Sequence, residues 1–558
     1  MFTRCRSIKG SLSDMLSVAK MSLNKIPLAT EQKRFSDTMV AVLIAVSAIS
    51  LLLTVTDRSI KGWISFSLLL LLGAWLCWYA FRLAQSEQQL RWLWMLMAAA
   101  VVLRLALGAF WFVVLPVYGW GSETEKAGYV FKDAYKRDVS AWELAHSQKS
   151  LFSAFSQDIR TDQYGGLLFL SAAVYRYQGG IVHQPLLMVV FSAVFSSLSI
   201  LFTWAFVRLI VNARAAAIAA WVLALYPETM LLGSSQMREA YVMTFAAMAF
   251  YGLTIYIHRK EPVGVWWLVV SLLLCMLFSP PSVAMLVIAL LMLAFGLLIT
   301  RPSAKTLSTL QRLSRFKTLW LVFIIIILLT IIGLWLSWGQ IAPKGITNIW
   351  GWWFRKATTY QFFLSHQDSG WLQREFRKLP DLLHFPALVF YGILRPFLPA
   401  AIVGYSNPVW YGIALWRSLG WTFFLLSIIY ATLRLWLPPS LPKERRLFLF
   451  IVCLIVWLGI IIATYRGGGD DWDSPRYRVM FVSLQVGLVG WGWSEIKRDS
   501  LRCLAIATIF FLAWFFPWYI RRYRGLEWQV ISIFHTVGLG IASAILYVIW
   551  DLHHKDRQ

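Results

Sequence analysis

Residues 447–464 read LFLFIVCLIVWLGIIIAT, an apolar run without a charged side chain. A helix needs about 20 such residues to cross the hydrocarbon core of a bilayer. Apolar runs of this kind recur from Val40 to Trp550, which predicts a polytopic, all-α membrane protein. The runs are continuously apolar and do not alternate with polar residues, so membrane-spanning β-strands are not expected.

Composition supports the same class of protein. Of the 558 residues, 59% are apolar and 14% are charged, whereas a soluble domain averages about 25% charged residues. Much of the net charge of +25 lies in short segments between apolar runs, which indicates membrane orientation rather than nucleic-acid binding. The cysteines show neither metal-ligand spacing nor a disulfide framework. The first apolar run begins near Thr38, which favours a first span over a cleavable signal peptide.

We predict about fourteen transmembrane helices, joined by outer-face loops that carry short amphipathic helices. The spans lie near 39–56, 63–81, 92–116, 184–211, 214–232, 239–257, 264–279, 282–300, 318–337, 418–436, 447–464, 477–494, 503–520 and 529–550. The chain divides into a basic N-terminal segment (1–38), three helices (39–116), a long outer loop (117–183), further helices (184–337), a second outer segment with interfacial helices (338–417) and C-terminal helices with a short cytoplasmic tail (418–558).

The positive-inside rule sets the predicted orientation. Lys and Arg gather in the N-terminal segment and in residues 301–317, 442–446 and 495–502, and span counting places all of them on one side. We therefore expect both termini in the cytoplasm and the long loops outside the inner, or plasma, membrane. Segment 386–404 is apolar enough to cross, but a re-entrant or interfacial helix there keeps the basic residues 443–446 inside. The arginines at 521, 522 and 524 fall outside in this scheme and do not fit the rule.

The outer loop 117–183 is the first candidate for chemistry. Loops longer than about 12–15 residues are usually functional or disordered, and this one is too rich in aromatic and apolar residues to favour disorder. Asp133 precedes residues 138–146, which read as a short amphipathic helix on the bilayer surface. A carboxylate there can accept a proton from an incoming hydroxyl or amine, as a general base. The alternative is a solvated carboxylate paired with a neighbouring Lys or Arg.

Arg238 and Glu239 form a second candidate, at the outer edge of a predicted span. Such a pair can hold a lipid-linked phosphate or orient a catalytic acid, because ionisable residues at membrane depth are usually functional. Alternatively, the two side chains mark the interface by snorkelling.

Arg476-Tyr477-Arg478, with Arg395 as a companion, forms a third candidate. Guanidinium groups match phosphate oxygens in a two-point geometry, and a polyprenyl phosphate carries its anionic head at this depth. Interfacial anchoring explains the same residues without a ligand.

A divalent cation, Mg²⁺ or Mn²⁺, stays open as a cofactor. Asp470, Asp471 and Asp473 offer the hard oxygen ligands that such ions prefer, but beside a run of glycines they also fit a solvated acidic turn. No glycine-rich nucleotide loop or HExxH motif occurs. An enzyme acting outside the cell has no nucleotide-sugar pool, so an activated sugar must arrive attached to lipid.

These segments, in this order, resemble the GT-C superfamily of integral-membrane glycosyltransferases, and within it relatives of protein O-mannosyltransferases and of the lipid A aminoarabinose transferase. The resemblance covers about 92–495. The segments that carry it are Asp133 with Trp142-Glu143-Leu144-Ala145, Asp162-Gln163-Tyr164-Gly165-Gly166, Leu225-Tyr226-Pro227-Glu228, Met237-Arg238-Glu239, Leu394-Arg395-Pro396-Phe397 and Arg476-Tyr477-Arg478.

The resemblance implies a donor that is a polyprenyl-phosphate sugar and inversion at the anomeric carbon. It implies that Asp133 is catalytic and that Arg238, Arg476 and Arg478 hold the donor phosphate. Further site candidates are Glu239, Arg395, Tyr477, Asp138, Asp162, Gln163 and Tyr164. The sequence departs from the family pattern in having two spans before the one that leads into the Asp133 loop, and in having Ala134 where many relatives have Glu.

Three functions fit these observations. The first is an inverting glycosyltransferase that moves a sugar from a polyprenyl-phosphate carrier to a hydroxyl or amine of a lipid, glycan or protein. The second is a flippase or transporter of lipid-linked sugars, which calls for ionisable residues at mid-membrane, and these are scarce here. The third is a polymerase or ligase that transfers whole oligosaccharides. No nucleic-acid partner is expected.

Overall fold

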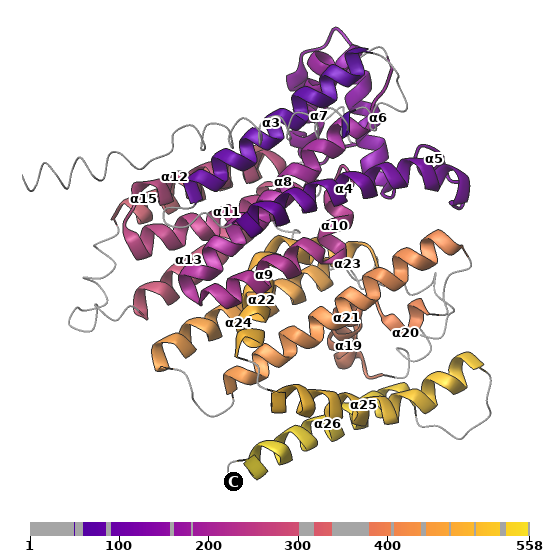
Figure 1. The fold of residues 1–558 in the computed structure, drawn as a ribbon, viewed down its shortest axis with the longest axis vertical. Helices are drawn as coiled ribbons and strands as arrows, with labels where there is room; N and C mark the ends of the chain where they lie inside the picture. The colour runs from indigo at the N-terminus through magenta and orange to yellow at the C-terminus, as the bar shows by residue number, and fades with distance from the viewer. Residues whose placement is uncertain are drawn as a thin grey trace, which may run out of the picture. The chain divides into compact units, whose positions relative to one another are not determined.

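The computed structural model describes the chain in two compact units, Met1–Leu71 and Leu72–Gln558, with the boundary inside helix α3. The residues described are 49–50, 60–84, 91–156, 161–179, 182–300, 317–336, 379–402, 407–436, 442–467, 470–495, 498–524 and 532–555. Every regular element within these ranges is helical (Figure 1). The helical bounds are α3 Ile60–Ala84, α4 Arg91–Tyr118, α5 Glu123–Lys126, α6 Lys132–His146, η2 Leu151–Phe155, α7 Gly166–Gln178, α8 Leu186–Ile210, α9 Ala213–Leu225, α10 Pro227–Gly233, α11 Arg238–Arg259, α12 Pro262–Phe278, α13 Pro280–Ile299, α15 Lys317–Leu336, α19 Asp381–Leu394, α20 Leu398–Ala401, α21 Pro408–Trp436, α22 Lys443–Gly467, α23 Asp473–Arg478, η5 Val479–Phe481, α24 Val482–Ser494, α25 Arg498–Arg524 and α26 Ile533–Lys555.

The prediction of a helical membrane protein is confirmed, whereas the count of about fourteen spans is not. Within the described residues, 7 helices are long and apolar enough to cross a membrane, or 8 if the bent pair α9–α10 is one span. Most of the predicted span 39–56 lies outside the described residues. The predicted span 477–494 is divided into the end of α23, the short η5 turn and α24.

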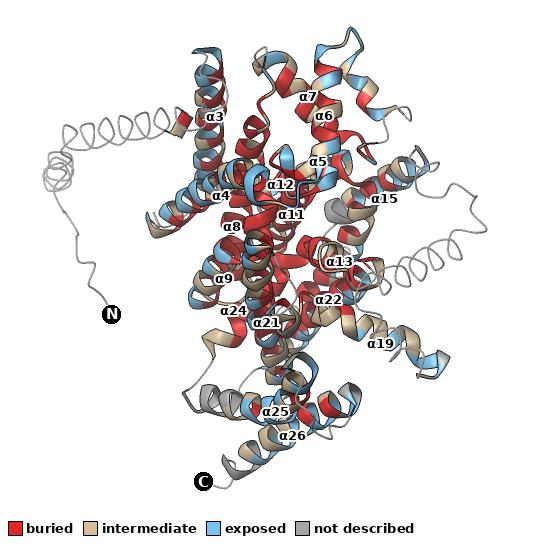
Figure 2. Ribbon diagram, turned by 90° about the vertical axis from the view of Figure 1, so that its right-hand side faces the viewer, coloured by how far each residue is buried: buried red, intermediate tan, exposed pale blue. Residues whose placement is uncertain are grey.

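The core of the second unit is built around α8 and α11. Nearly all residues of both helices are buried, as the continuous red ribbon in Figure 2 shows. Helix α11 packs closely on α12 where two glycines face each other: a Cβ on Gly252 would lie 2.7 Å from the carbonyl oxygen of Gly264, and one on Gly264 would lie 2.6 Å from that of Gly252. Small residues of this kind let apolar helices approach backbone to backbone.

The outer loop predicted over 117–183 folds into α5, α6, η2 and α7 in its described part. The helix expected over 138–146 begins earlier, at Lys132, and its buried face packs against α7. Arg176 of α7 closes the C-terminus of α6, because its guanidinium donates to the carbonyl oxygens of Leu144 (2.6 Å) and Ala145 (3.1 Å). Helix ends leave such carbonyls without intrahelical partners.

A bend of 55° separates α9 from α10 at Tyr226–Pro227. Proline has no N–H and cannot continue the helical ladder of α9. The Thr229 hydroxyl lies 2.8 Å from the carbonyl oxygens of both Leu223 and Tyr226 and can donate its single proton to that of Leu223, which lacks its helical donor because residue 227 is proline. The bend places Glu228 at the start of α10, among α4, α8 and α21.

Candidate functional site

Arg476 joins three helices that are far apart in the sequence. Its Nη1 lies 3.1 Å from Asp133 Oδ2 at the start of α6 and 3.6 Å from Asp473 Oδ1 in its own helix, α23. Its Nε lies 3.0 Å from Glu239 Oε1 in the first turn of α11. The side chain of Arg476 is 10% exposed, whereas that of Asp133 is 59% exposed. One face of Asp133 is therefore held by the arginine and the other is open to an incoming molecule.

The charge on Arg476 is stabilised by its neighbours. Burial by itself would lower the pKa of the guanidinium, but the carboxylates of Glu239, Asp473 and Asp133 outweigh that effect and raise it above its usual value. These carboxylates therefore favour the cationic form of Arg476.

A cavity of about 40 Å³ opens beside Arg476, where the N-termini of α11 and α13 meet the ends of α22 and α23. Three guanidinium groups, one carboxylate, two hydroxyls and one phenol line it: Arg238, Arg466, Arg476, Glu239, Ser279, Ser282 and Tyr477. Helix N-termini and guanidinium groups both favour anions. A cavity of this volume has room for a few water molecules at about 10–15 Å³ each.

Aromatic rings orient two of the guanidinium groups. The Arg238 guanidinium lies 5.0 Å from the centre of the Tyr164 ring, and that of Arg466 lies 4.2 Å from the centre of the Tyr477 ring. Burial raises the pKa of the Tyr164 phenol, so the ring stays neutral under its cation. Such cation–π contacts fix a cation without neutralising its charge.

The structure brings most of the predicted site residues together. Asp133 and Glu239 contact Arg476 directly, while Arg238 and Tyr477 line the cavity. Tyr164 reaches the cavity indirectly, under Arg238.

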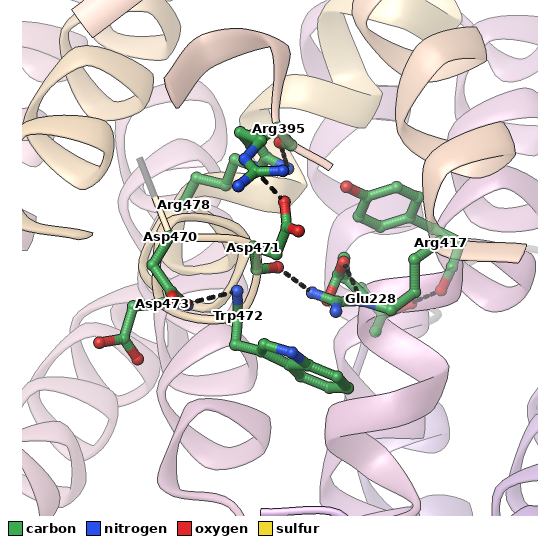
Figure 3. A network of polar contacts seen from close by, with 10 residues as sticks. Glu228, Arg395, Arg417, Asp470, Asp471, Trp472, Asp473 and Arg478 are labelled. Carbon is green, nitrogen blue, oxygen red and sulfur yellow. Dashed lines mark hydrogen bonds and ion pairs between the residues drawn. The ribbon is translucent and has the colours of Figure 1, made fainter. Parts of the chain in front are cut away.

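Arg395 and Arg478 lie elsewhere, in the network shown in Figure 3, and do not line the cavity. The Arg478 Nη2 donates to the Arg395 carbonyl oxygen at 2.8 Å, and its guanidinium lies 3.2 Å from the centre of the Trp421 ring. Burial lowers the pKa of Arg478 to about 10. Contact between Arg478 and a donor phosphate would need a movement of this network.

Three further candidates have local roles. The carboxylate of Asp138 accepts hydrogen bonds from the Tyr129 and Tyr175 hydroxyls and lies 2.9 Å from His183 Nε2. The carboxylate of Asp162 accepts from the backbone N–H groups of Leu167 (3.1 Å) and Leu168 (3.0 Å), so it caps α7. Gln163 is exposed on the preceding turn.

The three acids proposed for a divalent cation face separate partners. Asp470 accepts from the N–H groups of Trp472 and Asp473, Asp471 pairs with Arg395 at 2.9 Å, and Asp473 faces Arg476. Among the described residues, no group of three or more His, Cys, Asp or Glu side chains fits a metal ion.

Sequence reasoning missed Arg466, Ser279 and Ser282, all of which line the cavity. The sequence did contain a signal for Arg466, because this residue comes shortly after the apolar run 447–464 and lies at the end of that run nearer in sequence to Arg476. The two serines precede and open an apolar helix, and only packing against α11 and α22 gives them a site to face.

No family model matches the chain, and no curated protein matches it. Solved structures that are similar to it include three of the archaeal oligosaccharyltransferase of Archaeoglobus fulgidus. The first is the enzyme in complex with an inhibitory peptide and a dolichol-phosphate. It matches with a TM-score of 0.39 and 12% sequence identity, and the match covers 83% of this chain and 56% of that chain. The second is the enzyme tethered to an acceptor peptide that contains the NVT sequon. Its TM-score is 0.38 at 12% identity, and the match covers 83% of this chain and 55% of that chain. The third is the apo form, with a TM-score of 0.35, 12% identity and a match over 82% of this chain and 55% of that chain. The chain thus spans little more than half the length of these enzymes, and a similarity this weak decides neither its fold nor its activity.

Proposed function

We propose that the protein is an inverting glycosyltransferase of the inner, or plasma, membrane. It transfers a sugar from a polyprenyl-phosphate carrier to a hydroxyl or amine of a lipid, glycan or protein on the outer face. In this proposal both termini are cytoplasmic, and α6 with the cavity faces the periplasm or the cell exterior.

One observation carries the proposal: a half-exposed carboxylate, Asp133, is linked through Arg476 to a cavity with a surplus of positive charge. Glycosyl transfer from a phosphate carrier needs a base on one side of the anomeric carbon and cations on the other. The cavity lies among the apolar helices α11, α13 and α22, where a lipid carrier can present its head group.

The step balances as a displacement at the anomeric carbon. An acceptor oxygen or nitrogen forms the new bond to that carbon while its proton passes to the free oxygen of Asp133. The bond between the anomeric carbon and the phosphate oxygen breaks, and the electron pair stays on the phosphate. Arg238, Arg466 and Arg476 then stabilise the additional negative charge of the polyprenyl phosphate, which is the main electrostatic contribution to catalysis.

The test uses purified protein in liposomes with polyprenyl-phosphate sugars and a mixture of acceptors. Asp133→Asn keeps a neutral partner for Arg476 but removes the base, so we expect transfer to fall by about 10²–10⁴-fold, the usual contribution of a general base. Release of polyprenyl phosphate, measured by mass spectrometry, reports the reaction whatever the acceptor is.

Glu143→Gln is the matched control, because Glu143 lies on the same helix, is exposed and does not line the cavity. It should transfer sugar like the wild type. Full activity of Asp133→Asn would refute the assignment of the base. Movement of the intact lipid-linked sugar across the liposome membrane without release of polyprenyl phosphate would instead identify a flippase.

A further inference from the structure

A buried ion pair lies in the polar network of Figure 3, outside the lining of the cavity. Arg417 of α21 directs Nε to Glu228 Oε1 of α10 at 2.8 Å, and the two side chains are 3% and 2% exposed. The same guanidinium donates from Nη2 to the Asp471 carbonyl oxygen at 2.6 Å and lies 4.0 Å from the centre of the Trp472 ring. Arg417 thus connects α10 and α21 to the turn that precedes α23 (Figure 3).

This turn, residues 470–473, decides where α23 begins. The Asp470 carboxylate accepts from the N–H groups of Trp472 (2.7 Å) and Asp473 (2.8 Å), which closes the turn on itself. The Asp471 carboxylate pairs with Arg395 Nε at 2.9 Å. Arg417 and Arg395, neither of which lines the cavity, therefore both hold the turn at Asp471.

Arg476 follows the turn within the short helix α23, and its contacts allow little movement. Its Nη1 donates a hydrogen bond of 3.1 Å to Asp133, and its Nε forms an ion pair with Glu239 Oε1 at 3.0 Å. Hydrogen bonds weaken steeply beyond about 3.5 Å. A displacement of the turn by half an ångström or more would therefore loosen Arg476 from the base and from the cavity.

We propose that Arg417 is a positioning residue for Arg476, with Glu228 holding Arg417 in place. The proposal rests on the proposed function, because sugar transfer is its readout. Arginine is required here because one planar guanidinium serves the Glu228 carboxylate, the Asp471 carbonyl and the Trp472 ring together. A lysine ammonium is a point charge that cannot span all three.

The first test is Arg417→Lys, which keeps the charge beside Glu228 but loses the bond to Asp471 or the contact with Trp472. We expect kcat/KM for the lipid-linked donor to fall about tenfold to a hundredfold, as for a misplacement of about 1 Å, with the amount of folded protein unchanged. Arg445→Lys is the matched control: Arg445 also donates to a backbone carbonyl, that of Val211 at 3.2 Å, but from the first turn of α22, at the end opposite to the cavity-lining Arg466. It should retain wild-type kcat/KM.

A double variant separates positioning from plain stabilisation. Arg417→Met alone leaves a buried, unpaired Glu228 and should lower thermal stability. Arg417→Met with Glu228→Met removes both charges, and apolar replacement of a buried pair commonly restores stability. We expect the double variant to recover its melting temperature but not its kcat/KM.

Two results would overturn the inference alone: a double variant that regains wild-type transfer, or an Arg417→Lys protein as active as Arg445→Lys. Both presuppose that the wild type transfers sugar and that Asp133→Asn does not. A wild-type protein that transfers no sugar from any polyprenyl-phosphate donor overturns the proposed function first, and this inference with it.

Discussion

Asp133 and Asp138 lie five positions apart on α6 and have opposite surroundings. Asp133 keeps a side chain that is 59% exposed and contacts Arg476 across to α23. The Asp138 side chain is fully buried among the phenols of Tyr129 and Tyr175 and the imidazole of His183, which lies between α7 and α8. The comparison teaches that one helix can carry an acid available for chemistry and an acid that fixes the position of the helix, with burial distinguishing the two.

The sealed cluster also orients the exposed acid. Arg137, next to Asp138, donates to the Gln236 carbonyl just before α11, while Asp138 ties α6 to Tyr175 of α7. These contacts hold α6 in a fixed rotation, in which Asp133 points toward Arg476. The two acids therefore play complementary roles, and substitutions should separate them.

The largest expected effect is the loss of stability in Asp138→Leu. Removing the carboxylate leaves two buried phenol donors without their acceptor, at a cost of about 1–3 kcal/mol each. Thermal unfolding in detergent should show a clear drop in melting temperature. A variant as stable as the wild type would contradict the structural role given to Asp138.

A smaller effect is expected at alkaline pH. Burial, together with the charge of Asp138, raises the pKa of the Tyr129 and Tyr175 phenols well above the usual value. Above pH 10 or so, the unfolded chain releases these protons and the folded chain keeps them, so stability is present below the unfolded pKa and is lost as pH rises. Each phenol contributes a slope of about −1.4 kcal/mol per pH unit in that range.

Tyr175→Phe should reduce that slope by the contribution of one phenol. The control is Tyr177→Phe in the same helix, because Tyr177 is 75% exposed and its replacement should leave the slope unchanged. The measurement is the free energy of chemical unfolding between neutral and strongly alkaline pH. Equal slopes for both variants would count against the buried cluster.

The smallest expected effect on stability is that of Asp133→Asn. A half-exposed ion pair contributes about 0–1 kcal/mol, so the melting temperature should hardly change while sugar transfer is lost. Calorimetry on the same preparation used for the transfer assay checks this. A loss of stability as large as that of Asp138→Leu would show that Asp133 has a structural role.

The sequence went furthest where length and polarity decide the outcome. Continuous apolar runs predicted a helical membrane protein, and the predicted positions of Asp133, Arg238, Glu239 and Arg476 coincide with residues that meet around one centre. It failed where a helix ends inside an apolar region, as in the division of 477–494 into η5 and α24. A break of this kind is tolerated because neighbouring helices bury the irregular backbone, and the local sequence does not show which helices will pack there.

The roles of charged residues show the same limit. Arg476 and Arg478 are two positions apart, yet one lines the cavity and the other lies against Trp421. In a helix two positions correspond to a rotation of about 200°, which puts the two side chains on opposite faces, but the predicted span 477–494 did not place both residues in one helix, as α23 does. Arg417 carried no signal in the sequence, since its three partners come from residues 228, 471 and 472.

The chain's membrane class was thus determined by its sequence alone, because transfer of apolar runs out of water depends on composition and length. Only the tertiary structure decided that the Asp133 carboxylate stays exposed, that Arg476 lines the cavity and that Arg478 packs against Trp421 instead. The reason is physical: desolvation and ion pairing depend on distances between segments that are hundreds of residues apart in the chain, such as the 3.1 Å between Asp133 and Arg476.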